Sequence, residues 1–120
     1  MNVLITGSDG FIAKNLKFFL NDRSDIKIYS LTKKHNLSEL DNLVNKVDFV
    51  FHLAGTNRSE NLDDFTCGNE KLTYNLCCAI KKTKKKIPII YSSTIKVESS
   101  NPYGVSKKNT EKILYDFSNE

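Results

Sequence analysis

Short apolar runs alternate along the chain with longer stretches in which apolar residues recur every three or four positions. The short runs predict β-strands at residues 3–5, 26–31, 48–53 and 87–91. The longer stretches predict helices that begin near Phe11, near Leu37, at Phe65 and after Pro102. Alternating strands and helices with short connections are typical of a parallel sheet covered by helices. We therefore expect an α/β fold with a doubly wound parallel sheet of the Rossmann type.

Composition and charge are those of an ordinary globular domain. The chain has 120 residues, of which 39% are hydrophobic and 27% charged, so we expect one domain over residues 1–120. Its net charge of +4 comes largely from a lysine run at residues 81–86. This run lies between an apolar helix and an apolar strand, which favours a solvated helix end over a nucleic-acid interface. We therefore expect no nucleic-acid partner.

The sequence shows no membrane-spanning stretch, no secretion signal and no metal-binding spacing of cysteines. No apolar stretch approaches the roughly 20 residues that span a bilayer, and the first residues do not resemble a secretion signal. The three cysteines, Cys67, Cys77 and Cys78, show neither the spacing of a metal site nor a disulfide framework. We expect a cytoplasmic protein with no membrane partner and no metal.

A glycine-containing turn follows the first predicted strand and opens the first predicted helix. Its residues are Thr6, Gly7, Ser8, Asp9, Gly10, Phe11, Ile12 and Ala13. Gly7 permits a tight turn, Gly10 leaves room for a pyrophosphate, and Ala13 lets the helix lie close to the sheet. The N–H groups that begin the helix would then face the pyrophosphate of a dinucleotide. The alternative is an ordinary strand-to-helix turn.

Two lysines follow the second predicted strand. An acidic residue at this place binds the ribose hydroxyls of NAD, whereas a basic residue accommodates the 2′-phosphate of NADP. Residues 29–35 contain Lys33 and Lys34 but no Asp or Glu. We therefore predict NADP(H) in preference to NAD(H), the alternative being that both lysines are exposed loop charges.

Tyr103 and Lys107 are four residues apart in the last predicted helix and so share one face. A nearby ammonium favours the phenolate, whose ordinary pKa is near 10, and makes tyrosine a usable acid or base. The hydroxyl that polarises a reacting carbonyl is expected where the fourth strand ends, at Thr94 or, as second choice, Ser93. The tyrosine–lysine spacing alone is common on helices, but with the glycine turn and this strand end it predicts hydride chemistry.

Together these motifs resemble the extended short-chain dehydrogenases/reductases, the NAD-dependent epimerase/dehydratase family that modifies sugar nucleotides. The matching segments are residues 6–12, 52–55, 91–94 and 102–107. Within the family the chain looks closest to the UDP-sugar reductases of capsular-polysaccharide synthesis, because of residues 52–58 and the short connection from Thr94 to Tyr103. Those enzymes use NADPH, which agrees with Lys33.

The resemblance implies roles for the matching positions. Tyr103 would be the acid/base, Lys107 its partner and Thr94 the hydroxyl donor. The implied cofactor contacts are Gly7, Asp9, Gly10, Phe11, Ile12, Lys33, Leu53, Ala54, Gly55, Asn69, Tyr103 and Lys107. Two departures from the family pattern are Ala13, in place of the usual third glycine, and Asn36-Leu37, where many relatives have Asp-Ile near the adenine.

The implied activity is reduction, epimerisation or dehydration of a nucleotide sugar, a UDP-sugar with a 4-keto group, for surface polysaccharide. Family members extend well beyond the helix that carries the tyrosine and lysine. We therefore expect a truncated chain that lacks the C-terminal part of the sheet and the substrate domain. The alternatives are an NADP(H)-binding module without turnover and a fragment without a ligand. The last strand would expose an edge along which copies could form a homo-oligomer.

Overall fold

The structure, a computed structural model, describes residues 1–32, 35, 38–55, 66–93 and 102–119. The chain forms two compact units, which we describe separately. The first consists of residues 1–54 and 79–92, and the second of residues 55–78 and 93–120.

The first unit is built on a parallel sheet of four strands. These are β1 (Asn2–Thr6), β2 (Lys27–Leu31), β3 (Phe49–His52) and β4 (Ile89–Tyr91), in the order β2-β1-β3-β4. Thr6 lies opposite Leu31 of β2 and opposite His52 of β3. This register brings the carboxyl ends of the three strands to one edge of the sheet, where the turn after β1 begins.

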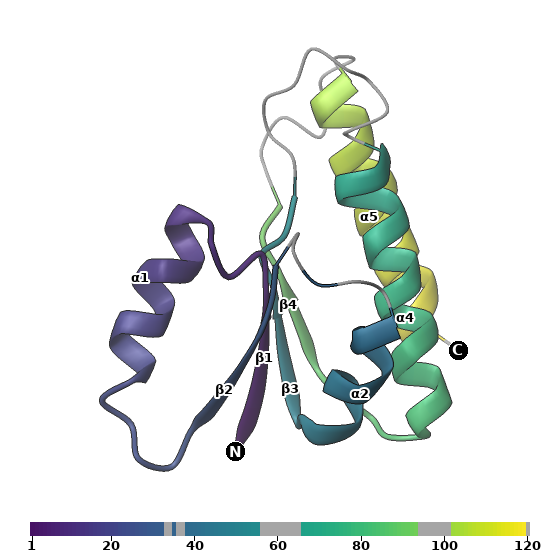
Figure 1. Cartoon of the computed structure of the whole chain (residues 1–120). Helices are drawn as coiled ribbons and strands as arrows, with labels where there is room; N and C mark the ends of the chain where they lie inside the picture. Colours follow the sequence, from purple (N-terminus) through teal and green to yellow (C-terminus); the bar gives the residue numbers. More distant parts are fainter. Residues whose placement is uncertain (33–34, 36–37, 56–65, 94–101, 120) are drawn as a thin grey trace. The chain divides into compact units, whose positions relative to one another are not determined.

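Helices α1 (Phe11–Leu20) and α2 (Ser38–Lys46) lie on opposite sides of this sheet (Figure 1). Ala13 of α1 is buried with Val3 and Ile5 of β1. Leu4, which points to the other face, is fully buried as well. Both faces of β1 are covered, so side chains that point to either face are apolar. Three apolar residues therefore follow one another in β1, instead of alternating with polar residues.

The apolar residues of α1 do not all face the sheet. Ala13 is buried, and Leu16 and Leu20 pack against the core at its edge. Phe11 and Phe19, by contrast, are exposed, with 84% and 70% of their surface accessible. The spacing therefore predicted the helix correctly, but its buried stripe is narrower than the apolar residues suggest.

The second unit contains η1 (Thr66–Lys71), the start of α4 (Leu72–Thr83) and α5 (Pro102–Ser118). Helix α5 packs against η1. The sequence predicted a single α-helix from Phe65, but residues 66–71 are wound as a π-helix instead. Within the second unit Asn69 and Thr73 are fully buried, and the Thr73 hydroxyl donates to the Asn69 carbonyl over 2.6 Å. Such π-turns are often found at functional sites.

The expected fold class is confirmed, since the sheet is parallel and its strands alternate with helices. Strand ends differ slightly from the prediction: β2 begins at Lys27 and β4 covers only residues 89–91. Within the described ranges, the helices are too short or too polar to cross a bilayer.

We expect Gly7→Ala to destabilise the chain strongly. Gly7 has a φ of +66°, and a Cβ there would lie 2.6 Å from the Cα of Ala54. The backbone conformation alone would cost a residue with a side chain about 1–3 kcal/mol. Urea unfolding followed by circular dichroism measures this loss.

Gly10→Ala is the matched control, because Gly10 has an ordinary φ of −74° and a Cβ would lie 3.2 Å from the Gly7 carbonyl oxygen. We expect it to cost about 1 kcal/mol or less. Equal losses for the two variants would contradict the assigned turn geometry.

Candidate functional site

The turn between β1 and α1 is held by backbone hydrogen bonds. The Gly7 N–H donates to the Leu31 carbonyl over 2.9 Å, and the Gly10 N–H donates to the Gly7 carbonyl over 2.9 Å. Gly7 also packs directly on the backbone of Ala54. The turn is thus fixed to the carboxyl ends of both neighbouring strands.

The N-terminus of α1 is suited to an anion. Gly10 occupies the cap position without a side-chain hydrogen bond, and the first turn contains no acidic residue. Phe11 and Ile12, whose N–H groups begin the helix, have exposed side chains. Helix N–H groups that lack a capping side chain carry partial positive charge and bind phosphate readily.

Ser8, which the sequence analysis did not select, lies in the same turn. Its hydroxyl is buried and has no hydrogen-bond partner among the described residues. A buried hydroxyl without a partner is costly and uncommon. Only the general rule that such a group needs a partner, and not its spacing in the sequence, could have drawn attention to it.

A hydroxyl joins the ends of β1 and β3. The Thr6 Oγ1 accepts from the Ala54 N–H over 3.1 Å and lies 2.7 Å from Nδ1 of His52. His52 is fully buried, with its ring 5.5 Å from that of Tyr91 on β4. These contacts fix the point where the chain leaves β3, at Leu53 and Ala54.

In the second unit, Asn69 and Ser106 connect η1 to α5. The Asn69 Nδ2 donates to the Ser106 Oγ over 2.7 Å, and the Ser106 hydroxyl donates to the Tyr103 carbonyl over 2.9 Å. Both side chains are almost fully buried. The first turn of α5, which carries Tyr103, is therefore tied to the π-helix.

Lys107 is buried beside this connection, with 5% of its surface exposed. Burial lowers the pKa of its ammonium below the ordinary 10.5, and the carboxylate of Glu111 acts in the opposite direction. A Cβ on Gly55 would lie 2.7 Å from Oδ1 of Asn69 and 3.5 Å from Nζ of Lys107. Glycine at position 55 therefore leaves room where an amide oxygen and a buried ammonium converge.

The buried face of α5 is polar. Its buried residues are Gly104, Ser106, Lys107 and Thr110. Val105, an apolar residue of the same helix, is by contrast 43% exposed. Burying polar groups costs free energy unless they are hydrogen-bonded, so such a face is typical of a functional site rather than of a core.

The other predicted residues are distributed as follows. Tyr103 is half-buried in the first turn of α5, one turn before Lys107, so the predicted pair lies on one helix. The exposed Ser93 donates its hydroxyl to the carboxylate of Glu111. Thr94, Lys33, Asn36 and Leu37 lie outside the described residues. The proposed catalytic and cofactor-binding roles stay predictions.

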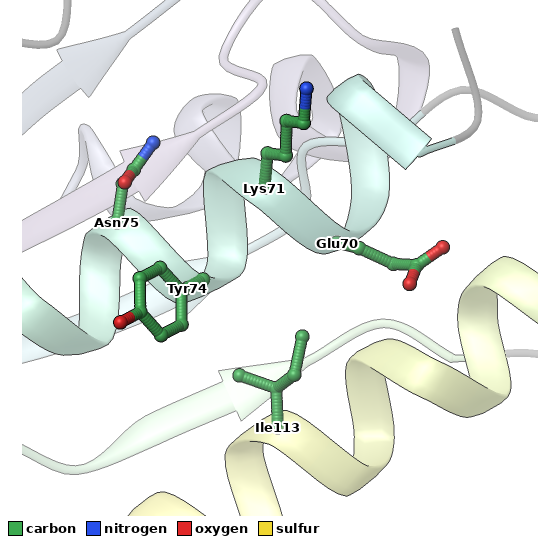
Figure 2. A pocket seen from close by; sticks show the side chains of 5 residues that line it. All are labelled: Glu70, Lys71, Tyr74, Asn75 and Ile113. Carbon is green, nitrogen blue, oxygen red and sulfur yellow. The ribbon is translucent and has the colours of Figure 1, made fainter. Parts of the chain in front are cut away.

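A hollow in the second unit contains none of the predicted residues. It is lined by Glu70, Lys71, Tyr74, Asn75 and Ile113. In Figure 2, Tyr74 and Ile113 face each other from α4 and α5. A hydrogen bond with Cys78 raises the pKa of Tyr74, so Tyr74 stays a neutral phenol at neutral pH.

In the part of the chain that the structure describes, no group of three His, Cys, Asp or Glu residues could hold a metal ion.

Comparison with known proteins identifies the family. The model of the NAD dependent epimerase/dehydratase family matches residues 3–120. The chain belongs to this family. The match covers the glycine turn, the β3 end and the tyrosine–lysine helix together, and it confirms the resemblance that these motifs indicated.

Two of the relatives are linked by name to UDP-sugars or capsules. The chain is 42% identical over 114 residues to a UDP-2-acetamido-2,6-beta-L-arabino-hexul-4-ose reductase from Pseudomonas aeruginosa, covering 95% of the chain and 31% of that protein. It is 36% identical to the capsular polysaccharide assembling protein CapF from Staphylococcus aureus, with a TM-score of 0.83, covering 99% of the chain and 32% of CapF. The chain thus spans about a third of each relative.

A more distant structure supports the fold. UDP-glucuronic acid 4-epimerase from Bacillus cereus, solved in complex with NAD, has a TM-score of 0.87 and 20% identity. The match covers all of the chain and 53% of that epimerase. At this identity the likeness concerns the fold alone.

Burial of Lys107 predicts a specific pH dependence of stability. Because its pKa is lower in the folded chain than in the unfolded chain, the unfolded chain binds more protons between the two values. The contribution of Lys107 to stability therefore rises as the pH increases toward 10.5. We expect Lys107→Met to be more stable than the parent chain at pH 7, by an amount that shrinks toward pH 10.

Urea unfolding at the two pH values measures this difference. Lys108→Met is the control, because Lys108 is the exposed neighbour on the same helix. A stability difference for Lys107→Met that is the same at both pH values would contradict a lowered pKa of Lys107 in the folded chain.

Proposed function

We propose that this chain is the dinucleotide-binding part of an NADP(H)-dependent reductase of 4-keto nucleotide sugars, with a UDP-sugar as substrate. The observation that carries the proposal is the polar buried face of α5, where Ser106 bonds Asn69 and where Asn69 and Lys107 lie beside Gly55. A structural helix pair would bury apolar groups here. Membership of the epimerase/dehydratase family and the relation to a UDP-sugar reductase support the same activity.

The described residues fit a dinucleotide. The uncapped N-terminus of α1 offers N–H groups to a pyrophosphate, and the buried Ser8 hydroxyl in the same turn has no hydrogen-bond partner among the described residues. Gly55 keeps the backbone free of a side chain next to the Lys107 ammonium. A bound nicotinamide would supply the hydride.

Proton transfer is assigned to Tyr103. Lys107 lies one turn further along the same face of α5. Tyr103 would give its proton to the carbonyl oxygen of the sugar at neutral pH and recover it afterwards. Thr94, or Ser93 as second choice, would donate a hydrogen bond to the same oxygen and orient it.

Cofactor preference is assigned to Lys33. The stretch after β2 contains Lys33 and Lys34 and no acidic residue, which suits the 2′-phosphate of NADP. We also propose a cytoplasmic location, because Cys77 and Cys78 are present as thiols, the form that a reducing compartment maintains. Self-association would use β4, which is the last strand of the described sheet.

The test is oxidation of NADPH in the presence of a UDP-4-keto sugar, comparing the parent chain with Tyr103→Phe. Loss of the phenolic proton should lower the rate about 100-fold or more, since positioned acid–base groups contribute about 10²–10⁴-fold. Tyr115→Phe is the matched control, because Tyr115 is an exposed tyrosine on the same helix. NADPH should also be oxidised faster than NADH.

Three results would contradict parts of this proposal. An unchanged rate in Tyr103→Phe would remove Tyr103 from proton transfer. Equal use of NADH and NADPH would remove the role of Lys33. Cofactor binding without oxidation in the parent chain would leave the chain as a binding module.

A further inference from the structure

Thr6, His52 and Tyr91 form one row across three neighbouring strands of the first unit. Thr6 on β1 lies opposite His52 on β3, and His52 lies opposite Tyr91 on β4. Thr6 and His52 are fully buried, and Oγ1 of Thr6 lies 2.7 Å from Nδ1 of His52. The ring of Tyr91 lies 5.5 Å from the imidazole, with 33° between the two planes. An imidazole can carry a proton on Nδ1, on Nε2 or on both, and its hydrogen-bond partners decide which.

The single proton of the Thr6 hydroxyl decides the protonation of His52. Among the described residues the hydroxyl has two partners, the Ala54 N–H at 3.1 Å and Nδ1 of His52. The Ala54 N–H can only donate, so the Thr6 oxygen accepts there and its own proton must go to Nδ1. If Nδ1 carried a proton, this buried hydroxyl would have no acceptor in the described part of the chain, which is costly.

Nδ1 of His52 is therefore an acceptor, and the ring carries its proton on Nε2. A neutral imidazole has one proton, so a bare Nδ1 requires a protonated Nε2. The charged form, with protons on both nitrogens, is incompatible with the same arrangement. Other contacts of the ring leave this assignment unchanged, because it depends only on the partners of Thr6.

The same proton orients the Thr6 oxygen toward Ala54. With its proton directed at Nδ1 of His52, the hydroxyl presents its lone pairs to the Ala54 N–H. Ala54 is the residue on which Gly7 packs, since a Cβ on Gly7 would lie 2.6 Å from the Cα of Ala54. The imidazole thus acts through Thr6 on the backbone that supports the glycine turn.

We propose that His52 is a positioning residue, whose neutral imidazole takes the Thr6 proton at Nδ1 and so keeps the Thr6 oxygen on the Ala54 N–H beside the glycine turn. All of these residues belong to the first unit. The importance of the arrangement for cofactor binding rests on the proposed function, because the glycine turn is where a pyrophosphate would bind.

The first test is the protonation state of His52 in the parent chain at neutral pH. Long-range ¹H–¹⁵N correlation spectra distinguish a protonated ring nitrogen from a bare one. We expect a bare Nδ1 and a protonated Nε2 for His52. A proton on Nδ1 would overturn the proposal, and this measurement needs no variant that has to fold.

Two pairs of variants test the positioning of Ala54. Thr6→Val keeps the shape of threonine without its hydroxyl, whereas Thr6→Ser keeps the hydroxyl. His52→Leu removes the acceptor, whereas His52→Asn can place its amide oxygen near the position of Nδ1. We expect hydrogen exchange of the Ala54 amide to become about five- to tenfold faster in Thr6→Val and His52→Leu, and to stay near the parent rate in Thr6→Ser and His52→Asn. The amide of Leu4, fully buried in β1, corrects for a general loss of stability.

A parent-like exchange rate of Ala54 in His52→Leu would show that His52 does not position Ala54 and would overturn the proposal. Equal rates in Thr6→Val and Thr6→Ser would also overturn it, because the hydroxyl would then have no part in holding Ala54. Neither measurement needs a cofactor. A chain with the expected proton positions and exchange rates that fails to bind NADPH would refute the proposed function and leave the role of His52 intact.

Discussion

The hydroxyl of Thr6 joins the carboxyl ends of β1 and β3, and the rest of the first unit is arranged around that junction. It accepts from the Ala54 N–H and contacts Nδ1 of the buried His52. The next residue, Gly7, then passes so close to Ala54 that a Cβ would lie 2.6 Å from its Cα. This close approach requires glycine at position 7, and the glycine at the cap position, Gly10, leaves the first N–H groups of α1 without a side-chain cap. The tight turn at Gly7 is thus followed by a helix N-terminus of the kind that binds anions readily.

The second unit is held together by buried polar groups. Each buried polar residue costs free energy unless its donors and acceptors are matched. Asn69 and Ser106 satisfy each other, and Thr110 donates to the Ser106 carbonyl over 2.8 Å. Lys107 keeps a burial cost, seen as a lowered pKa. Residues that perturb one another in this way are concentrated at functional sites, although structural networks can do the same.

The sequence predicted features that depend on local chemistry. Apolar runs located all four strands, the glycines located the turn after β1, and a spacing of four placed Tyr103 and Lys107 on one helix. Features that depend on packing could not be predicted from the sequence. The π-turn that buries Asn69 leaves no trace in apolar spacing, and Phe11 is exposed although it fits the helical pattern. The motif at residues 102–107 likewise does not reveal that the Ser106 hydroxyl contacts Asn69 and the Tyr103 carbonyl, because those contacts depend on the fold.

The central claim of the proposed function is that the glycine turn of the first unit binds a dinucleotide. An NADPH titration of the ¹⁵N-labelled chain, followed by amide and side-chain resonances, tests it most directly. The proposed binding predicts saturable shifts at Gly7, Gly10 and Phe11 of the first unit, and the proposed roles of the second unit predict shifts at the Asn69 side chain and the Lys107 amide. No shifts at millimolar NADPH, or shifts confined to the hollow lined by Tyr74 and Ile113, would contradict it.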